Sequence, residues 1–232
     1  YERVKDFLIW KTSEGNWSTI GEVLERAKEK KITYASHEQN SLVIDLYKQK
    51  QIEILFATAP VDTPVIQYLE EHLSVPFQRI DGSINEALLD PSREKTLLNA
   101  EGKSESATIA DFVRTALGNK DLEVEAKSFA SDQLPALIVL DENQRRFRDY
   151  IALTQGKREA GFGSKKFVVN TNSPLVQAMV RLQHRQPEVA EEIAKGVYDL
   201  SLLAQRELDP SELSQVVTRQ TKVLEKLANL LA

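Results

Sequence analysis

The strongest constraint on how this chain folds is an apolar stripe near its C-terminus. Leucine and valine recur there at spacings of three and four residues, and Gln220 interrupts the pattern at one position. A heptad-like pattern of this kind is typical of a helix that packs along its length against other helices. Few residues follow the stripe, so we expect the preceding helix, another chain, or both to cover it. The stripe comprises Leu213, Val216, Val217, Val223, Leu224, Leu227, Leu230 and Leu231.

A long helix is expected just before this stripe. Val189, Ile193, Val197 and Leu200 recur at helical spacing, and Asp209-Pro210 then supplies a cap and a first-turn proline for the last helix. The pattern leaves two arrangements open. The two helices could pair antiparallel within one chain, or they could join a second copy in a dimeric bundle.

The first part of the chain alternates strands with helices. Short β-prone runs are separated by segments whose apolar residues recur at helical spacing. This order predicts parallel strands joined by crossover helices that cover the sheet. The expected strands are 32–35, 52–57 and 77–80, and the expected helical segments lie near 42–47 and 65–69. Before them, Thr19 and Glu22 form a capping-box pattern that predicts a polar helix to about Lys30.

The second part of the chain predicts a mixed α+β domain. The polar, glycine-containing stretch 101–106 marks the expected boundary, so the predicted domains are 1–103 and 104–232. The predicted fold class is α/β and α+β, and a small βαβαβ three-layer subdomain is expected in the first part of the chain. A charged helix opened by Asp90-Pro91 is expected before the boundary. The elements expected after the boundary are a helix at 106–117, strands at Val124, 136–140 and 167–169, and a helix opened by Ser173-Pro174.

Composition excludes several classes of function. The chain has no cysteine, which removes disulfide scaffolds, zinc–thiolate sites and cysteine nucleophiles. Its 30 basic and 35 acidic residues give a net charge of −5, so no nucleic-acid partner is expected. Its three histidines lie far apart, which argues against a metal site, and its longest apolar runs are too short to cross a membrane. The first residue is Tyr1 rather than Met, so we expect a piece of a longer protein.

No catalytic motif emerges from the sequence. Asp62 and Asp81 follow predicted strands, where carboxylates can serve a site, but without a nucleophile or metal ligand they are interpreted as caps and turns. Gly161-Phe162-Gly163-Ser164-Lys165-Lys166 lacks the spacing of a phosphate loop. Trp10 and Trp17 flank a polar stretch and predict a hairpin or an edge aromatic pair rather than a ligand cage.

The segment 141–153 combines aromatic residues with arginines. As a helix it would place Phe147, Tyr150 and Ile151 together, with Arg145, Arg146 and Arg148 around them. The three apolar residues could be buried in their own domain. Alternatively, they could form a partly exposed patch that contacts other chains.

The order of several short phrases resembles the ninety-kilodalton heat-shock chaperone family, most closely its bacterial HtpG type. The resemblance covers essentially the whole chain. Thr171 and Ser173 depart from the family's proline and histidine, which predicts a looser turn there. The phrases are Lys31–Ala35, Ile52–Phe56 with Ala59–Asp62 and Tyr68-Leu69, Leu134–Val139, Phe167–Val176, and Leu200–Leu203 with Leu208–Pro210.

This resemblance implies the distal middle domain and the C-terminal dimerisation domain of a cytoplasmic, ATP-dependent chaperone that assists protein folding under stress. It implies a homodimer through a four-helix bundle, built from helices near 188–207 and 211–231 of each copy. ATP and Mg would bind the full-length protein upstream, so this piece would hold no cofactor and would not be an enzyme. Implied dimer-interface residues are Val197, Leu200, Leu213, Val216, Val217, Gln220, Val223, Leu224, Leu227 and Leu231.

The resemblance also implies contact with unfolded client proteins. Phe147, Tyr150 and Ile151 match client-contact positions of the C-terminal domain, and Gln67 matches a contact region of the middle domain. Two other functions stay open: a small α/β enzyme using the first sheet's carboxyl edge, and a regulatory dimerisation module that binds no clients.

Overall fold

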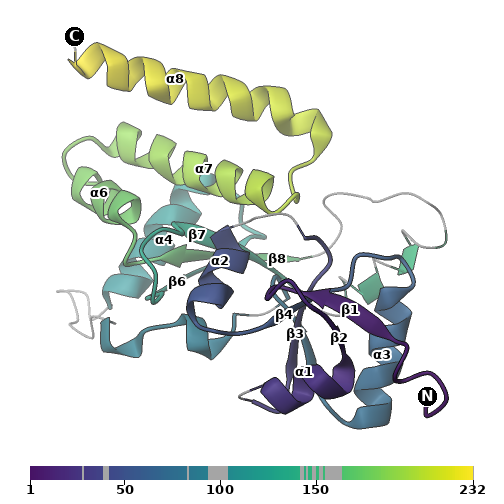
Figure 1. Cartoon of the computed structure of the whole chain (residues 1–232). Helices are drawn as coiled ribbons and strands as arrows, with labels where there is room; N and C mark the ends of the chain where they lie inside the picture. The colour runs from purple at the N-terminus through teal and green to yellow at the C-terminus, as the bar shows by residue number, and fades with distance from the viewer. Residues whose placement is uncertain are drawn as a thin grey trace. The chain divides into compact units, whose positions relative to one another are not determined.

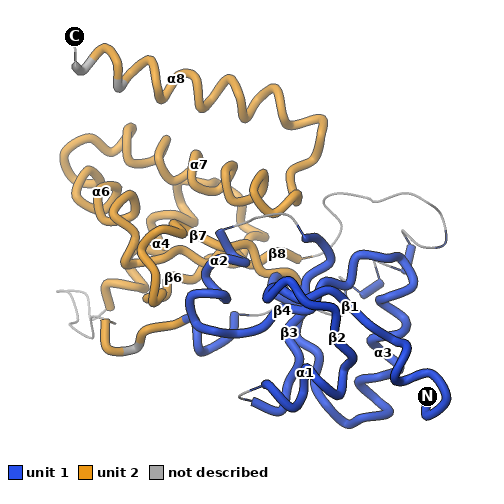
Figure 2. Tube along the Cα trace, in the orientation of Figure 1, with its two compact units in different colours: residues 1–88, 141–159 blue, residues 89–140, 160–232 orange. Residues whose placement is uncertain are grey.

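The structure is a computed structural model with two compact units (Figures 1 and 2). Unit 1 contains residues 1–88 and 141–159, and unit 2 contains residues 89–140 and 160–232. The units differ from the expected ranges 1–103 and 104–232, and residue 103 is not among the described residues, so the domain boundary stays a prediction. The described residues are 1–27, 29–38, 42–82, 84–93, 104–141, 144, 146, 147, 150, 151, 154 and 164–231.

Unit 1 is built on a five-stranded mixed sheet with strand order β2-β1-β4-β3-β5. β3 pairs parallel with both β4 and β5, which confirms the predicted parallel arrangement. β1 pairs antiparallel with β4 and forms a hairpin with β2, so the sheet has two strands beyond the expected three. Strands this short carry too little alternation to be recognised alone. The strands are β1 (Ile9–Thr12), β2 (Trp17–Thr19), β3 (Ile32–Ala35), β4 (Ile54–Phe56) and β5 (Phe77–Arg79).

The hairpin confirms the interpretation of the two tryptophans. Trp10 is paired with Ser18 and points into the core, whereas Trp17 is paired with Lys11 and is 64% exposed. The two indoles therefore lie on opposite faces of the hairpin, because neighbouring strand positions alternate in direction.

Helices α1 (Ile20–Arg26), α2 (Leu42–Gln49) and α3 (Asp62–Leu73) connect these strands, and a short 3₁₀ helix, η1, spans Glu86–Leu88. Helix α1 begins with a capping box, in which the Thr19 hydroxyl accepts from the Glu22 amide and the Glu22 carboxylate accepts from the Thr19 amide. Helices α1 and α3 contribute to one apolar cluster with the sheet. Its buried members are Trp10, Ile20, Val23, Ile32, Tyr34, Leu55, Ala57, Ile66, Leu69 and Phe77.

Unit 2 contains a three-stranded mixed sheet with order β6-β8-β7, as expected for an α+β unit. β8 pairs parallel with β6 and antiparallel with β7. The helix expected after Asp90-Pro91 is a single 3₁₀ turn where it is described, and residues 94–103 lie outside the described part. The elements are η2 (Pro91–Arg93), α4 (Glu105–Leu117), β6 (Glu123–Lys127), β7 (Ala136–Leu140), β8 (Lys165–Asn170), α6 (Pro174–Leu182), α7 (Pro187–Ala204), η3 (Pro210–Glu212) and α8 (Leu213–Leu231).

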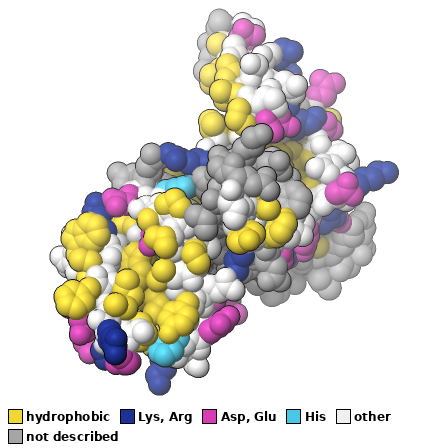
Figure 3. Space-filling view, turned by 90° about the vertical axis from the view of Figure 1, so that its right-hand side faces the viewer, with side chains coloured by type: hydrophobic (Ala, Val, Ile, Leu, Met, Phe, Trp, Pro, Cys, Tyr) yellow, Lys and Arg dark blue, Asp and Glu magenta, His cyan; other side chains and the backbone are white. Residues whose placement is uncertain are grey.

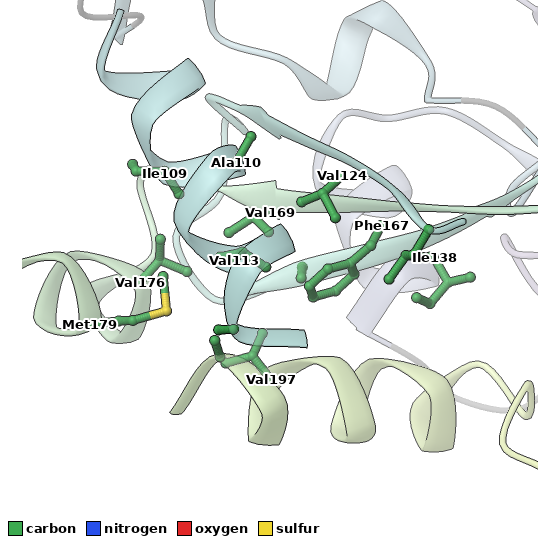
Figure 4. Packing of buried hydrophobic residues seen from close by; sticks show 14 of the residues in the cluster. Ile109, Ala110, Val113, Val124, Ile138, Phe167, Val169, Val176, Met179 and Val197 are labelled. Atoms are coloured by element: carbon green, nitrogen blue, oxygen red, sulfur yellow. The ribbon is translucent and has the colours of Figure 1, made fainter. Parts of the chain in front are cut away.

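The core of unit 2 lies between its sheet and helices α4, α6 and α7 (Figure 4). Phe167 and Ile138 project from the sheet, and Val113 and Val197 meet them from the helices. Burial of these side chains supplies the main stabilisation of the unit, at about 25 cal/mol per Å² of apolar surface.

Gln205 closes the open edge of this sheet. Its Oε1 accepts from the Ile138 amide at 2.7 Å, and its Nε2 donates to the Ile138 carbonyl at 2.8 Å. β7 is an edge strand, and unpaired edge groups invite pairing with other chains. The side chain therefore protects the edge and ties the end of α7 to the sheet.

The turn after β8 is held by a dense hydrogen-bond network centred on Asn170, which is fully buried. Asn170 Oδ1 accepts from the amides of Phe129 and Asn172, and Nδ2 donates to the carbonyls of Ser131 and Leu134. The Thr171 hydroxyl hydrogen-bonds that of Ser128 at 2.8 Å, and Gln177 donates to the Thr171 carbonyl. The looser turn expected at Thr171 is thus not seen, because hydroxyl and amide groups tie it down.

Helices α7 and α8 form an antiparallel pair (Figure 1). Asp199 of α7 is buried, and Arg219 of α8 donates to both its carboxylate oxygens, at 2.9 and 2.7 Å. A Cβ on Gly196 would lie only 3.2 Å from the Gln220 amide, so the glycine makes room for the polar residue in the stripe. Burial raises the pKa of Asp199, against the opposing effect of Arg219.

Asn170→Ala is expected to lower the free energy of unfolding of unit 2 by about 3 kcal/mol or more. The change leaves four backbone groups without their partner, two of them in buried hydrogen bonds and two in partly buried ones, and each buried unsatisfied group costs about 1–3 kcal/mol. Hydrogen exchange of the β8 amides measures this. Asn172→Ala is the matched control, because that side chain donates one bond, to the Phe129 carbonyl. Equal losses in the two variants would contradict the assignment.

Asp199→Asn is expected to alter how stability depends on pH. Because the folded pKa of Asp199 is raised, its contribution to stability is full below the unfolded value of 3.8 and is lost as pH rises through the folded value. The difference in unfolding free energy between variant and parent should change across that window and be constant above it. Urea denaturation at a series of pH values measures this, with Glu188→Gln, exposed on the same helix, as control. Parallel profiles for parent and Asp199→Asn would refute it.

Candidate interaction surfaces

A row of large apolar side chains stays exposed on the α7–α8 pair. On α8, Leu213, Val217 and Leu224 are 45%, 56% and 66% exposed, and they share one helix face with Gln220. On α7, Leu200 and Leu203 are exposed to a similar degree. We call these five apolar residues the open stripe. The helix pair therefore covers only part of the apolar surface that the sequence predicts.

The residues expected at a dimer interface differ in how far they are buried. Val197 lies in the core of unit 2, and Val216 is also buried. Gln220 and Val223 are partly buried, whereas Leu200, Leu213, Val217 and Leu224 are exposed. The side chains of Leu227 and Leu231 lie outside the described part. Whether these residues form an interface stays a prediction.

The segment 141–154 is helical at the six positions from Gln144 onward that the structure describes. Phe147 and Tyr150 are 52% and 61% exposed, while Ile151 is partly buried. The segment is grouped with unit 1. Of the two possibilities for this segment, the exposures of Phe147 and Tyr150 favour a partly exposed patch.

An ion pair joins this segment to α3. Arg146 donates to Glu70 Oε2 at 2.6 Å, and Glu70 Oε1 accepts from the Phe77 amide at 3.0 Å. Gln67, the fourth candidate for client contact, is exposed on α3 one turn before Glu70. The two elements that carry the client-contact candidates are thus linked through one carboxylate.

The carboxylates at the strand ends of unit 1 are committed to structural bonds. Asp62 accepts from the Trp10 indole at 3.0 Å and from the Ala59 amide at 2.7 Å. Asp81 makes a bidentate pair with the buried Arg79. These contacts match the interpretation of both residues as caps and turns, and they leave the enzyme hypothesis without support from this sheet edge.

The described residues provide neither a candidate metal site nor a candidate membrane span. They contain no group of three or more histidine, aspartate or glutamate side chains placed to hold a metal ion. In that same part of the chain, every helix is too short or too polar to cross a membrane.

Sequence reasoning missed a second exposed apolar surface in unit 1. Figure 3 shows hydrophobic side chains gathered on one face of the molecule. The register of the hairpin could have indicated part of it, since Ile9 and Trp17 lie on its outward face. The large apolar side chains of unit 1 with roughly half or more of their surface exposed, outside segment 141–159, are Val4, Phe7, Ile9, Trp17, Leu42, Val61 and Tyr68.

Comparison with known proteins identifies relatives along nearly the whole chain. A chaperone protein HtpG of Bdellovibrio bacteriovorus is 28% identical over 233 residues, covering 93% of this chain and 36% of that protein. The HtpG of Psychrobacter arcticus is 25% identical over 214 residues, covering 88% of this chain and 32% of that protein. The chain thus spans about a third of the length of these curated relatives.

The model of the family described as Hsp90 protein matches residues 1–230. This match runs through both units and includes the open stripe and the 141–154 segment. The order of short motifs in the sequence predicts the same relationship. This chain therefore belongs to the Hsp90 family, and its relatives are bacterial HtpG chaperones.

Proposed function

We propose that this chain is the dimerising and client-contacting part of an HtpG-type molecular chaperone. The observation that carries the proposal is the open stripe, which stays exposed after α8 has packed on α7. Several exposed large apolar side chains on one helix pair are typical of a protein interaction site. Membership in a chaperone family supports the same conclusion.

The partner of the open stripe is a second copy of the chain. An interface with two-fold symmetry lets one self-complementary patch cover itself, and two helices from each copy then make a four-helix bundle. Gln220 lies in the middle of the apolar row and would favour one register over others, as polar residues do in helical bundles.

The client surface lies on unit 1. Phe147 and Tyr150 offer exposed rings, and Arg146 beside them keeps the patch soluble while pairing with Glu70. Unfolded chains expose apolar side chains that can pack on such rings. Dimerisation places two of these surfaces at high mutual effective concentration, which strengthens the capture of a long client.

In this proposal, nucleotide binds a different part of the full-length protein. ATP and Mg would bind the part of the full-length protein that this chain does not match, and this chain would act without a cofactor. The compartment we propose is the cytoplasm, where the chaperone would assist folding under stress.

Val217→Asp combined with Leu224→Asp is expected to convert the dimer to a monomer. Each substitution places a charge in a seam that becomes desolvated on association, and an unpaired buried charge costs about 3–5 kcal/mol. Light scattering across a dilution series gives the mass. Thr218→Asp combined with Asn229→Asp is the control, because it adds the same charge to exposed positions away from the open stripe. A double variant as dimeric as its parent would refute the bundle.

Phe147→Ser combined with Tyr150→Ser is expected to weaken the binding of unfolded clients about tenfold or more. Loss of two exposed rings removes packing surface and changes no residue of α7 or α8. Suppression of the aggregation of a heat-denatured client measures the effect, and light scattering should show an unchanged mass. Full suppression by the variant would remove the client role from this segment.

A further inference from the structure

The last turn of α7 ends in a strained residue. Arg206 has a φ of 59°, in the left-handed region that a residue with a Cβ adopts at a cost. Its amide donates to the Leu203 carbonyl at 3.1 Å, and the Glu207 amide donates to the Leu202 carbonyl at 2.8 Å. These two bonds form a Schellman motif, in which glycine usually holds the position of Arg206. A strained turn of this kind persists only when its surroundings hold it.

Both neighbours of Arg206 hold the ends of strands β7 and β8. Gln205 binds both backbone groups of Ile138 in β7. Glu207 is 6% exposed, and its carbonyl accepts from Lys165 Nζ at 3.0 Å while its carboxylate lies 3.6 Å from the same nitrogen. Lys165 is the first residue of β8. The turn that ends α7 therefore holds one strand near its end and the next strand at its start.

The client-contact segment lies between these two strands in the chain. Leu140, the last residue of β7, pairs with Lys165, and residues 141–164 connect the two. Asp141 follows β7 directly, and its Oδ1 accepts from the Gln144 amide at 3.0 Å, which is the hydrogen bond of a helix N-cap. The helical part of the segment thus starts immediately after β7, so its position at this end depends on how the end of β7 is held.

The same turn of α7 carries part of the open stripe. Leu200 and Leu203 are both 46% exposed, and the Leu203 carbonyl is the acceptor for the Arg206 amide. A second copy of the chain that covers these two leucines would hold the last turn of α7 in its helical form. Without that cover, the strained residue lies at the end of a helix, where fraying begins.

We propose, on the basis of the dimer and client function proposed for this chain, that the α7 terminus (residues 205–207) couples the dimer interface to the client-contact segment. The turn has a formed and a frayed state, and dimerisation favours the formed one. Only the formed state holds the strand ends from which the segment starts. Each chain of a dimer therefore binds a client more tightly than a monomer does, beyond the gain from having two surfaces. Gln205 and Glu207 are positioning residues, because they act through the segment.

Binding of a short fluorescein-labelled peptide with one apolar anchor, Leu-Phe-Leu flanked by serines, tests the coupling by fluorescence anisotropy. A single anchor occupies one surface at a time, so the two surfaces of a dimer give no avidity. We expect the parent dimer to bind the peptide about fivefold more tightly per chain than the Val217→Asp/Leu224→Asp monomer. Equal affinities in a parent that dimerises and binds the peptide overturn the coupling alone. A parent that forms no dimer, or binds no peptide, overturns the proposed function as well.

Two substitutions, each made in the dimer and in the monomer, should abolish this difference in opposite ways. Lys165→Met removes the contact with Glu207, so the dimer should bind the peptide about as weakly as the monomer. Arg206→Gly relieves the strained conformation, so the monomer should bind about as tightly as the dimer. Lys166→Met is the matched control and should leave the difference unchanged, because that lysine pairs with acidic residues of β6.

The opposite directions separate coupling from a loss of stability. A merely destabilised unit 2 would weaken peptide binding in both variants and would not tighten it in the monomer. If Lys165→Met fails to fold, Arg206→Gly decides, because Arg206 is exposed. An unchanged difference between dimer and monomer in Arg206→Gly, or equal behaviour of Lys165→Met and Lys166→Met, overturns the proposal.

Discussion

Helix α7 packs against the core of unit 2 and against helix α8 at the same time, and the structure of unit 2 depends on this double packing. Its small and branched residues Ala190, Ala194 and Val197 are buried in the core of unit 2. Gly196 and Asp199 meet Gln220 and Arg219 of α8. The position of α8 depends on its packing on α7. The apolar side chains that this pairing leaves exposed on both helices form the open stripe.

Three side-chain amides of this protein fall into two kinds. Asn170 and Gln205 use both ends of their side-chain amides, so they fix a turn and close a sheet edge without leaving unpaired groups. Asn85 uses its oxygen only, and its nitrogen is buried without a partner. The first kind contributes structure.

The proposed client surface depends on a contact that is distant in sequence. Glu70 and Arg146 are separated by 76 positions, and their ion pair joins α3 to the segment that carries Phe147 and Tyr150. Both side chains are partly exposed, so the pair adds little stability by itself. Its effect is to place the two candidate contact elements in one unit.

Much of the fold follows from local signals that the sequence carries by itself. The capping box at Thr19, the proline after Asp209 and the apolar run 136–140 locate their elements because caps, turns and periodicity act over a few residues. The parallel pairing of three strands also follows from their order along the chain. Family membership is likewise readable from short motifs in order.

Only the tertiary structure decides which members of an apolar pattern are covered. Val216 and Val217 are neighbours in the same stripe, yet one is buried and the other is 56% exposed, since the position of α8 on α7 sets their directions. The pairing of β1 with β4, the Glu70–Arg146 pair and the unpaired Asn85 nitrogen could not be predicted for the same reason. Periodicity identifies an amphipathic face, but burial and hydrogen bonding depend on long-range neighbours that sequence spacing does not specify.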